Sequence, residues 1–494
     1  MGTVGQGRWD LVFPSGAPDR IGDMFATAVV ADAVRRFDAD LAQTVETCRD
    51  WHREYRTVFR GMTALAIGSP AVCAGIATEG LRSARNLLRF VTGYTVAPLR
   101  SIDVESQATA DTLRTGVVEG GAEPADRLEV PFRDGLLSGD ALRGKLTDWR
   151  QHGIIEPGFA AAVERVIDHP EWLALPGFRV IVAGVTELAP LRPLLHWGAD
   201  VLAIAPPGEQ RWRDLTELAR AGAGVLRYPI AAGPGADITR QFPALVHWIR
   251  AHLDDLRPVF GGYAHRPGPA GVRLAAAVDV LAEDLLSRRS DAVFALLGSP
   301  TDCYAVPETV VADAHRRRRD RGLRAVDQEV LRVLTRSALY QPSYRTHVTD
   351  QQGASWGIAD ALLPSQGPDH ALSHRLLRWR ASLAHTAGHP ISVTVAPPAW
   401  TRAIRAQRTL AAAYRSAHRY GIEIFAPDTA RTLLAAKLVA DLCAPPPVDS
   451  DTNPEYLFAL GAAHGGLWHQ PFEPSSILPV AAATGCVRGL FGTH

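Results

Sequence analysis

Cysteine is scarce in this chain: five cysteines are spread over 494 positions, and no two of them form a Cys-x-x-Cys pair. Small secreted proteins held together by disulfides carry more cysteines, and structural zinc sites need closely spaced ones. Lysine is scarcer still, because Lys145 and Lys437 stand against a long series of arginines. The cysteine pattern favours free thiols in a reducing compartment, and the lysine pattern leaves few positions for a catalytic lysine.

Net charge and long apolar runs are also missing. The 52 basic residues balance 52 acidic ones, so the composition indicates neither a nucleic acid nor an anionic membrane as partner. No basic segment followed by an apolar run opens the chain, which predicts no secretory signal. The most apolar stretch, Thr63 to Gly80, contains glycines and a proline and reaches only about the lower limit of a membrane span, so we expect a buried helical hairpin. We predict a cytoplasmic protein without a membrane segment.

Residues 1–174 are expected to form a mostly helical domain. The run from Ala26 to Arg60 lacks proline and glycine and carries apolar residues at roughly helical spacing. Polar residues near Ser138 and Glu156 resemble helix caps and predict further helix starts. Between these helices, Gly116 to Asp134 is polar and interrupted by glycine and proline, so it is predicted to be a loop.

From residue 175 the pattern changes to short β-branched runs that alternate with amphipathic helices. This alternation is typical of a parallel sheet covered on both faces. We predict an α/β domain over residues 175–445, with a doubly wound, mostly parallel, Rossmann-like sheet of about seven strands. Residues from about 302 to 368 are predicted to form a helical cap, and residues 446–494 a loop-rich C-terminal segment. The expected strands are 179–184, 200–205, 224–228, 258–263, 292–298, 391–396 and 422–426.

Residues that directly follow these strands are the expected sources of a site. Right-handed crossovers place the carboxyl ends of parallel strands along one edge of the sheet, where ligands usually bind. The segments concerned are 184–187, 205–210, 261–266, 299–304 and 397–401.

The order of elements from about Phe178 to Thr401 resembles the short-chain dehydrogenase/reductase family. The segment 182–190 lies where that family has its glycine-rich turn, residues 196–201 resemble its approach to the second strand, and residues 393–401 its late strand and turn. There is also a more general similarity to uncharacterised Rossmann-containing proteins of this length. The resemblance covers about half of the chain and implies a redox reaction that uses a nicotinamide cofactor on a small organic molecule.

The cofactor turn departs from the family pattern. Gly184 is kept, but Leu188 and Pro190 occupy the positions of two glycines that let the backbone approach a pyrophosphate. No acid closes the second strand to bind an adenine ribose, whereas Arg211 and Arg213 could hold a 2′-phosphate, so NADP is favoured over NAD. The alternative is that these arginines only solvate a helix start. The resemblance implies cofactor contacts from Gly184, Thr186, Glu187, Arg211, Arg213 and Tyr263.

The family's catalytic Tyr-x-x-x-Lys pair lies on the helix before the late strand, where this chain has His370-Ala-Leu-Ser-His374. The resemblance puts His370 in the place of the tyrosine, His374 in that of the lysine, and Ser299 in that of the carbonyl-orienting serine. Histidine is suited to general acid/base catalysis near neutral pH. A spacing of four is also a metal-ligand spacing, but no acidic partner stands nearby and no metal is predicted. A pair that only caps or solvates the helix is the alternative.

Two further groups of residues are candidates. Tyr344 in the predicted cap could close a pocket, although aromatic packing is the more frequent role of such a residue. His464 and His469, with Glu473 nearby, could form a metal or acid/base site.

The favoured function is that of an atypical NADP-dependent oxidoreductase acting on a small organic metabolite, with self-association left open. A non-redox enzyme or ligand-binding pseudoenzyme on the same fold stays open, and so does an S-adenosylmethionine-dependent methyltransferase. The missing acid after Ile204 counts against the methyltransferase.

Overall fold

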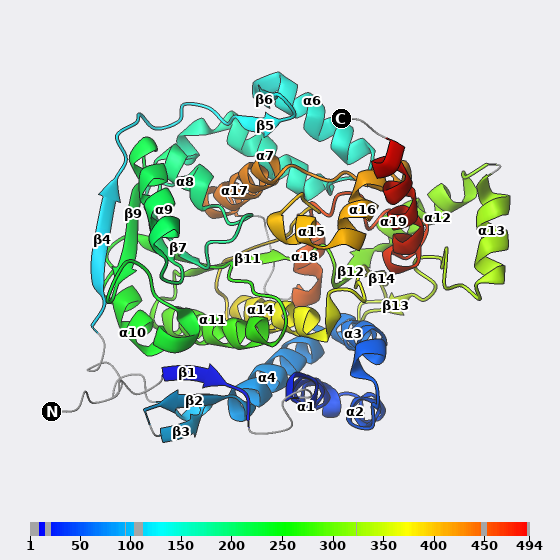
Figure 1. Cartoon of the computed structure of the whole chain (residues 1–494), viewed down its shortest axis with the longest axis horizontal. Helices are drawn as coiled ribbons and strands as arrows, with labels where there is room; N and C mark the ends of the chain where they lie inside the picture. The colour runs from blue at the N-terminus through cyan, green and yellow to red at the C-terminus, as the bar shows by residue number, and fades with distance from the viewer. Residues whose placement is uncertain are drawn as a thin grey trace.

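A computed structural model describes residues 9–14, 21–93, 95–102, 112–322, 324–445 and 452–491. A central sheet of seven strands runs through it in the order β15-β11-β10-β7-β8-β9-β4 (Figure 1). Neighbouring strands are parallel, except that β4 pairs antiparallel with β9. The strands are β4 (Arg114–Glu119), β7 (Phe178–Ala183), β8 (Asp200–Ile204), β9 (Val225–Ile230), β10 (Arg257–Gly262), β11 (Val293–Gly298) and β15 (Ile391–Val395).

The parallel strands follow the winding of a doubly wound sheet. The chain starts at β7 in the middle, moves outward through β8 to β9, returns to β10 beside β7, and then continues to β11 and β15. This is the order 3-2-1-4-5-6 known from nucleotide-binding sheets. The direction of winding reverses between β7 and β10, which is where ligands of such sheets usually bind.

The predicted α/β class is confirmed, and so are the parallel strands β7 to β11 and β15. The strand expected at 422–426 is wrong, because Phe425 makes only an isolated bridge with Ala399. The seventh strand is instead β4, whose last four residues fall in the segment predicted to be a loop. At Gly116 of this strand a Cβ atom would lie 2.3 Å from the ring of Tyr228 on β9. The glycine therefore serves close pairing at the sheet edge rather than a turn.

Helices cover both faces of the sheet, because successive strand residues point to opposite faces. Ile181 and Phe260 belong to one apolar core, and Val180 and Val259, their neighbours in sequence, belong to the other. The first core is closed by α10 (Ile238–Arg250), α11 (Pro269–Arg288) and α14 (Gly367–Thr386). The second is closed by α6 (Gly139–Gln151), α7 (Pro157–Asp168), α8 (Leu191–Trp197), α9 (Glu209–Ala221) and α17 (Pro427–Cys443).

The N-terminal region is mostly helical, as predicted, with α1 (Ile21–Arg35), α2 (Ala39–Glu46), α3 (Trp51–Gly68) and α4 (Pro70–Leu87). The expected hairpin is formed by α3 and α4, where Ser69 caps α4 by accepting from the Val72 amide. Helices α1, α3 and α4 pack against α14, and α4 also packs against α11 (Figure 1). A Cβ at Gly80 of α4 would lie 2.3 Å from the ring of Trp379 on α14. A small sheet of β1 (Trp9–Val12), β2 (Arg89–Thr92) and β3 (Thr95–Pro98) adjoins them.

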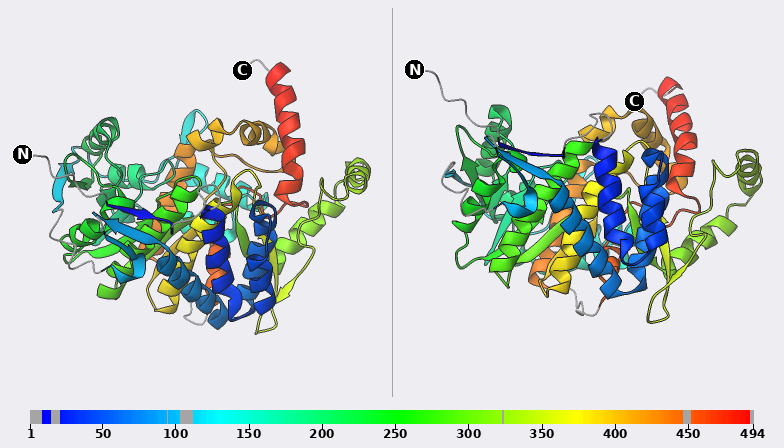
Figure 2. Two further views of the ribbon diagram at one scale, coloured as in Figure 1. Left: turned by 60° about the horizontal axis from the view of Figure 1, so that its bottom comes forward. Right: turned by 90° about the horizontal axis from the view of Figure 1, so that it is seen from below.

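The insertion between β11 and α14 differs from the predicted helical cap. It contains a three-stranded antiparallel sheet in the order β12-β14-β13 as well as two helices. The second of these helices, α13, projects away from the rest of the molecule (Figures 1 and 2). The elements are β12 (Cys303–Pro307), α12 (Glu308–Arg319), α13 (Arg324–Leu334), β13 (Val348–Thr349) and β14 (Ser355–Asp360).

The C-terminal part contains more helix than its sequence predicts. After β15 come α15 (Arg402–Ala406) and α16 (Arg408–Ser416), and the chain continues through α18 (Leu457–Leu460) to α19 (Pro474–Phe491). The loop-rich prediction is therefore wrong for residues 474–491, while residues 446–451 of the same segment lie outside the described residues. Within the described ranges, none of the helices combines the length and the apolar character needed to span a membrane.

Candidate active site

Three segments meet at the carboxyl edge of the sheet. The turn after β10 carries His265, the turn after β11 begins with Ser299, and the first two turns of α14 carry His370 and His374. The helix starts at Gly367, whose φ of 76° is one that glycine adopts readily, and the proline that follows suits a first helical turn. Because α14 packs against β11 and α11, its histidines lie beside the carboxyl ends of β10 and β11.

His265, His370 and His374 form a compact cluster. The ring centroid of His265 lies 5.4 Å from that of His370 and 5.1 Å from that of His374, and the latter two are 4.6 Å apart. One nitrogen from each ring lies within 4.8 Å of the others. His265 is exposed and the other two are half-buried, so the cluster is open to solvent on the His265 side. Three imidazoles are the protein ligands of one class of catalytic zinc site.

The surroundings of the cluster keep its rings neutral. Burial, helped by His265, lowers the pKa of His370 to about 3, although Asp302 acts in the opposite direction. Burial and the two neighbouring rings hold the pKa of His374 well below its ordinary value. Desolvation lowers the pKa of His265 as well, even though this residue is exposed at the rim. A metal ion binds neutral imidazole, so the cluster can accept one at neutral pH without first releasing protons.

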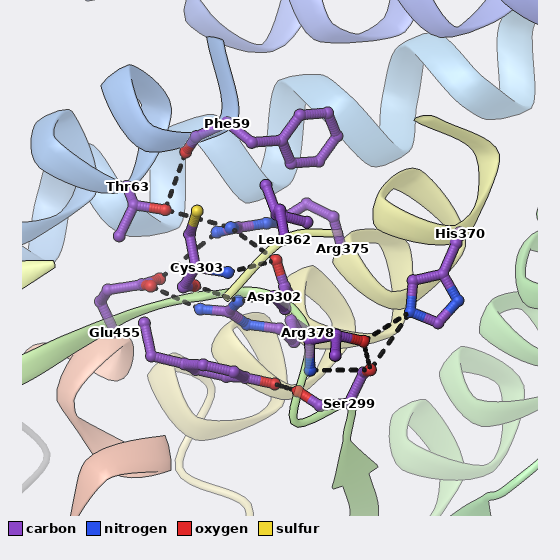
Figure 3. A network of polar contacts seen from close by, with 12 residues as sticks. Phe59, Thr63, Ser299, Asp302, Cys303, Leu362, His370, Arg375, Arg378 and Glu455 are labelled. Carbon is purple, nitrogen blue, oxygen red and sulfur yellow. Dashed lines mark hydrogen bonds and ion pairs between the residues drawn. The ribbon is translucent and has the colours of Figure 1, made fainter. Parts of the chain in front are cut away.

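Two hydroxyl groups contact His370 (Figure 3). Its Nε2 atom lies 3.2 Å from Ser299 Oγ and 3.4 Å from Thr301 Oγ1. The two hydroxyls are 2.9 Å from each other, and the Thr301 amide donates to Ser299 Oγ at 3.2 Å. The structure thus brings together Ser299, His370 and His374, as the sequence predicts. It adds Thr301, which lies in the segment 299–304 expected to supply site residues but which the sequence analysis did not single out.

A buried ion cluster lies one turn further along α14. Arg378 donates to Asp302 Oδ2 and to the Cys303 carbonyl, both at 2.7 Å, and pairs with Glu455 (Figure 3). Burial acts to raise the pKa of Asp302, but Arg378 and Arg375 outweigh it and hold that pKa below its usual value. Asp302 directly follows Thr301, so the ion cluster fixes the turn that carries the two hydroxyls.

The predicted cofactor residues of the first turn have structural partners. Gly184 has a φ of 96°, and a Cβ there would lie 2.2 Å from the Cα of Ala264. The turns after β7 and β10 therefore touch at the point where the winding reverses. Thr186 continues this turn, with its amide donating to the Gly184 carbonyl at 3.1 Å. Glu187 accepts from the Arg402 amide at 2.9 Å through its side chain.

Of the other predicted cofactor residues, the two arginines lie apart from that turn, whereas the Tyr263 amide donates to the Ala183 carbonyl at 3.0 Å, directly before it. Arg211 donates to the Pro206 carbonyl at 3.1 Å, and Arg213 pairs with Glu209 at 2.6 Å on the same exposed helix. Tyr263 is buried beside α17, and burial raises the pKa of its hydroxyl. The two arginines therefore lie on α9 and Tyr263 lies in the interior beside α17, so these residues do not line one common pocket.

Tyr344 does not join the histidine cluster. It is buried in the insertion, with a φ of 54°, and its hydroxyl donates to the Trp468 carbonyl at 2.6 Å. It lines a cavity of about 50 Å³ together with Arg60 and Asp360. Among the described contacts none connects it to His370 or Ser299, so its assignment to the catalytic group is not supported.

A second histidine cluster forms around Glu156. Its Oε1 atom lies 2.9 Å from His464 Nε2 and 3.0 Å from His469 Nε2, and His469 Nδ1 lies 2.6 Å from Asp313. The acid predicted to join these histidines, Glu473, pairs instead with Arg60. Burial acts to raise the pKa of Glu156, but hydrogen bonds from the two histidines outweigh it and lower the pKa to about 2.

The ring nitrogens of His464 and His469 in this second cluster take part in hydrogen bonds. The Gly466 amide donates to His464 Nδ1 at 3.1 Å, so that atom is unprotonated and Nε2 carries the proton given to Glu156. His469 has a carboxylate at each ring nitrogen, Glu156 at Nε2 and Asp313 at Nδ1. Through these contacts the cluster links α7, α12 and the C-terminal segment.

No protein-family model matches this chain, and no curated protein is significantly similar to it.

Sequence reasoning missed the third histidine of the first cluster. The segment 261–266 was expected to supply site residues, and His265 lies in it, but a single histidine after a strand has no partner at a recognisable spacing. Its partners, His370 and His374, follow more than a hundred positions later. The pairing of β10 with β11 and the packing of α14 on β11 and α11 bring the two segments to one edge.

The low pKa of His370 predicts a loss of stability in acid. The folded value is about 3 against 6.5 for the free side chain, so between these pH values the unfolded chain binds more protons. The stabilising contribution is present above pH 6.5 and is lost as pH falls toward 3. Between pH 7 and 5 the loss from this ring is about 2 kcal/mol.

Between pH 7 and pH 5 the free energy of unfolding of His370→Gln should therefore fall by about 2 kcal/mol less than that of the wild type. Urea unfolding of the metal-free proteins measures this difference. His152→Gln, at a side chain that is 69% exposed, is the control and should keep the wild-type pH dependence. Equal pH dependence in wild type and His370→Gln would contradict a buried neutral ring.

Proposed function

We propose that this chain is a metal-dependent enzyme that binds one zinc-type divalent ion through His265, His370 and His374 and acts on a small carbonyl-containing organic molecule. The observation that supports this is the meeting of three neutral imidazoles, open to solvent on one side, at the carboxyl edge of the sheet. Ligands of doubly wound sheets usually bind at that edge. Three-histidine sites leave one coordination position for water or substrate.

The residues around the cluster fit such chemistry. A bound zinc ion would lower the pKa of a coordinated water to about 7 or polarise a carbonyl oxygen. If Ser299 and Thr301 accept from His370 Nε2, they orient the ring and leave Nδ1 for the ion, as partners of metal-bound histidines commonly do. The reaction class that this arrangement favours is hydrolysis, or addition of water, at a carbonyl carbon.

NADP-dependent reduction is the second candidate. Two observations favour it: the Rossmann-like strand order, and the contact between Ser299 and His370 that the resemblance to short-chain dehydrogenases implies. Two others weigh against tight dinucleotide binding, namely the close contact of Gly184 with Ala264 and the pairing of Arg213 with Glu209. Reduction therefore ranks below metal-assisted hydrolysis.

Zinc titration tests the first proposal. Metal-free protein should bind one zinc ion per chain in a calorimetric titration. His265→Ala should weaken binding by more than roughly 100-fold, because a lost ligand should exceed the 10–100-fold effect of losing a residue that only orients one. His265 is exposed, so this variant is expected to fold.

His152→Ala, at an exposed histidine elsewhere, is the matched control and should bind zinc like the wild type. Zinc affinity that is unchanged in both His265→Ala and His374→Ala would refute the metal proposal. A thermal shift with NADPH and none with zinc would favour the reductase, since a ligand of the native state raises its stability.

A further inference from the structure

An apolar cavity of about 70 Å³ adjoins the candidate active site. It lies at the carboxyl edge of the sheet, between the turns after β11 and β15 and the helices α16 and α19. Within the described ranges its 18 lining residues include no Asp, Glu, Lys or Arg. Polar atoms reach it mainly from Thr301, Tyr414, Tyr420 and Gln470.

Thr301 connects this cavity to the histidine cluster. It lines the cavity, and its Oγ1 atom lies 3.4 Å from His370 Nε2 and 2.9 Å from Ser299 Oγ. A molecule that fills the cavity up to Thr301 therefore ends beside the hydroxyls that contact His370.

The helices that cover the cavity are held firmly to each other. They lie side by side (Figure 1), and a Cβ at Gly485 of α19 would lie 1.8 Å from the Ala412 carbonyl oxygen of α16. Ser416 also donates to the Ala481 carbonyl at 2.7 Å. Because their backbones already touch, the two helices cannot fill the cavity by moving closer together.

The cavity suits an apolar group better than water. A buried water needs about 10–15 Å³ of such space and two to four polar partners. The volume is enough for several waters, but one of the few polar groups, the Gln470 amide, already donates to the Gly466 carbonyl at 2.8 Å.

We infer that the cavity binds the apolar tail of the substrate, a short alkyl chain or an aryl ring, while the carbonyl end lies beside Thr301 and the histidines. The assignment of the carbonyl end rests on the proposed function, whereas occupation of the cavity does not need the metal. The substrate class is therefore a small carbonyl compound whose tail carries no charge.

A homologous series of primary amides, from acetamide to octanamide, tests this inference. Binding is measured by ligand-observed NMR on the metal-free full-length chain. The affinity should rise roughly threefold to fourfold for each added methylene until the cavity is full. Ala413→Leu, which fills the cavity from α16, should abolish this gain, and Ala481→Val does the same from α19. Ala312→Leu, at an exposed position of α12, is the control and should keep the gain.

An affinity that does not depend on chain length in the wild type would overturn the inference. So would a gain kept in full by a folded Ala413→Leu or Ala481→Val protein. Since these measurements use metal-free protein, failure of the cavity assignment leaves the zinc titration unaffected. Failure of zinc to bind would likewise leave the dependence on chain length as it is, so the two proposals fail separately.

Discussion

Arg378→Met should lower the free energy of unfolding by about 3–5 kcal/mol, the usual cost of removing one partner from a buried ion pair. Its side chain is 2% exposed and pairs with Asp302 and Glu455, which are 1% and 5% exposed. Without the guanidinium, two carboxylates remain in the protein interior. Arg375, at 3.6 Å from Asp302 and 3.8 Å from Glu455, compensates only in part. Urea unfolding at pH 7 measures the difference.

Two further variants make this prediction specific. Arg53→Met removes an ion pair with Asp50 whose arginine is 86% exposed, and it should change stability by less than about 0.5 kcal/mol. Adding Glu455→Gln to Arg378→Met removes one of the two uncompensated charges and should restore more than about 1 kcal/mol. A loss of under about 1 kcal/mol in Arg378→Met, equal to that of Arg53→Met, would show that the cluster is not buried as described.

Glu156→Gln should lower the free energy of unfolding by about 3 kcal/mol at pH 7. The pKa of this carboxyl is 4.5 in the free side chain and about 2 in the fold, and each unit of difference corresponds to about 1.4 kcal/mol. Because the folded value is depressed, the contribution is present above pH 4.5 and is lost as pH falls toward 2. Glutamine keeps the shape of the side chain and accepts one hydrogen bond, but it does not carry the charge that His464 and His469 stabilise.

The dependence of this destabilisation on pH shows whether the charge of the Glu156 carboxylate causes it. The difference in unfolding free energy between wild type and Glu156→Gln should shrink by about half between pH 7 and pH 3. Glu164→Gln on the same helix α7, at a half-buried position, is the control and should stay within about 0.5 kcal/mol of the wild type. A difference that stays constant with pH would mean that packing, rather than the carboxylate charge, is responsible.

The parallel strands could be predicted because each is a short, nearly continuous apolar run buried on both faces. The edge strand β4 could not, since three of its six residues are exposed and Gly116 suggests a turn. Conversely, Ile422 and Ile424 have the pattern of a strand, but their side chains line the cavity under α16 and α19. An apolar pattern shows that a residue is buried but does not show what buries it.

Helix α19 was missed for a related reason. Pro474, Pro479 and Gly485 suggest a loop, yet the first proline stands at the helix start and the glycine allows contact with Ala412. Small residues here mark close helix packing, which becomes visible only when the partner helix is known.

The candidate site also contains residues that the sequence could predict and residues that it could not. Ser299, His370 and His374 could be predicted because the resemblance to short-chain dehydrogenases implies a serine after a strand and a residue pair on one helix face. His265 could not be linked to them, because the link is made by strand pairing. Glu156, the partner of His464 and His469, lies 308 positions before the first of these histidines. Predicting such a cluster requires the order of the strands and the packing of the insertion.

The position of α3 and α4 has a consequence for synthesis of the chain. These helices are made early, yet the Asn453 amide that donates to the Ala66 carbonyl at 2.8 Å comes 387 residues later. At roughly 5–20 residues per second, the ribosome needs about 20–80 s to cover that distance. Helix α14, which begins 280 residues after the end of α4, is made sooner, and until then the apolar faces that meet it have no native partner. Slowing translation between α4 and α14 should therefore increase aggregation of the nascent chain.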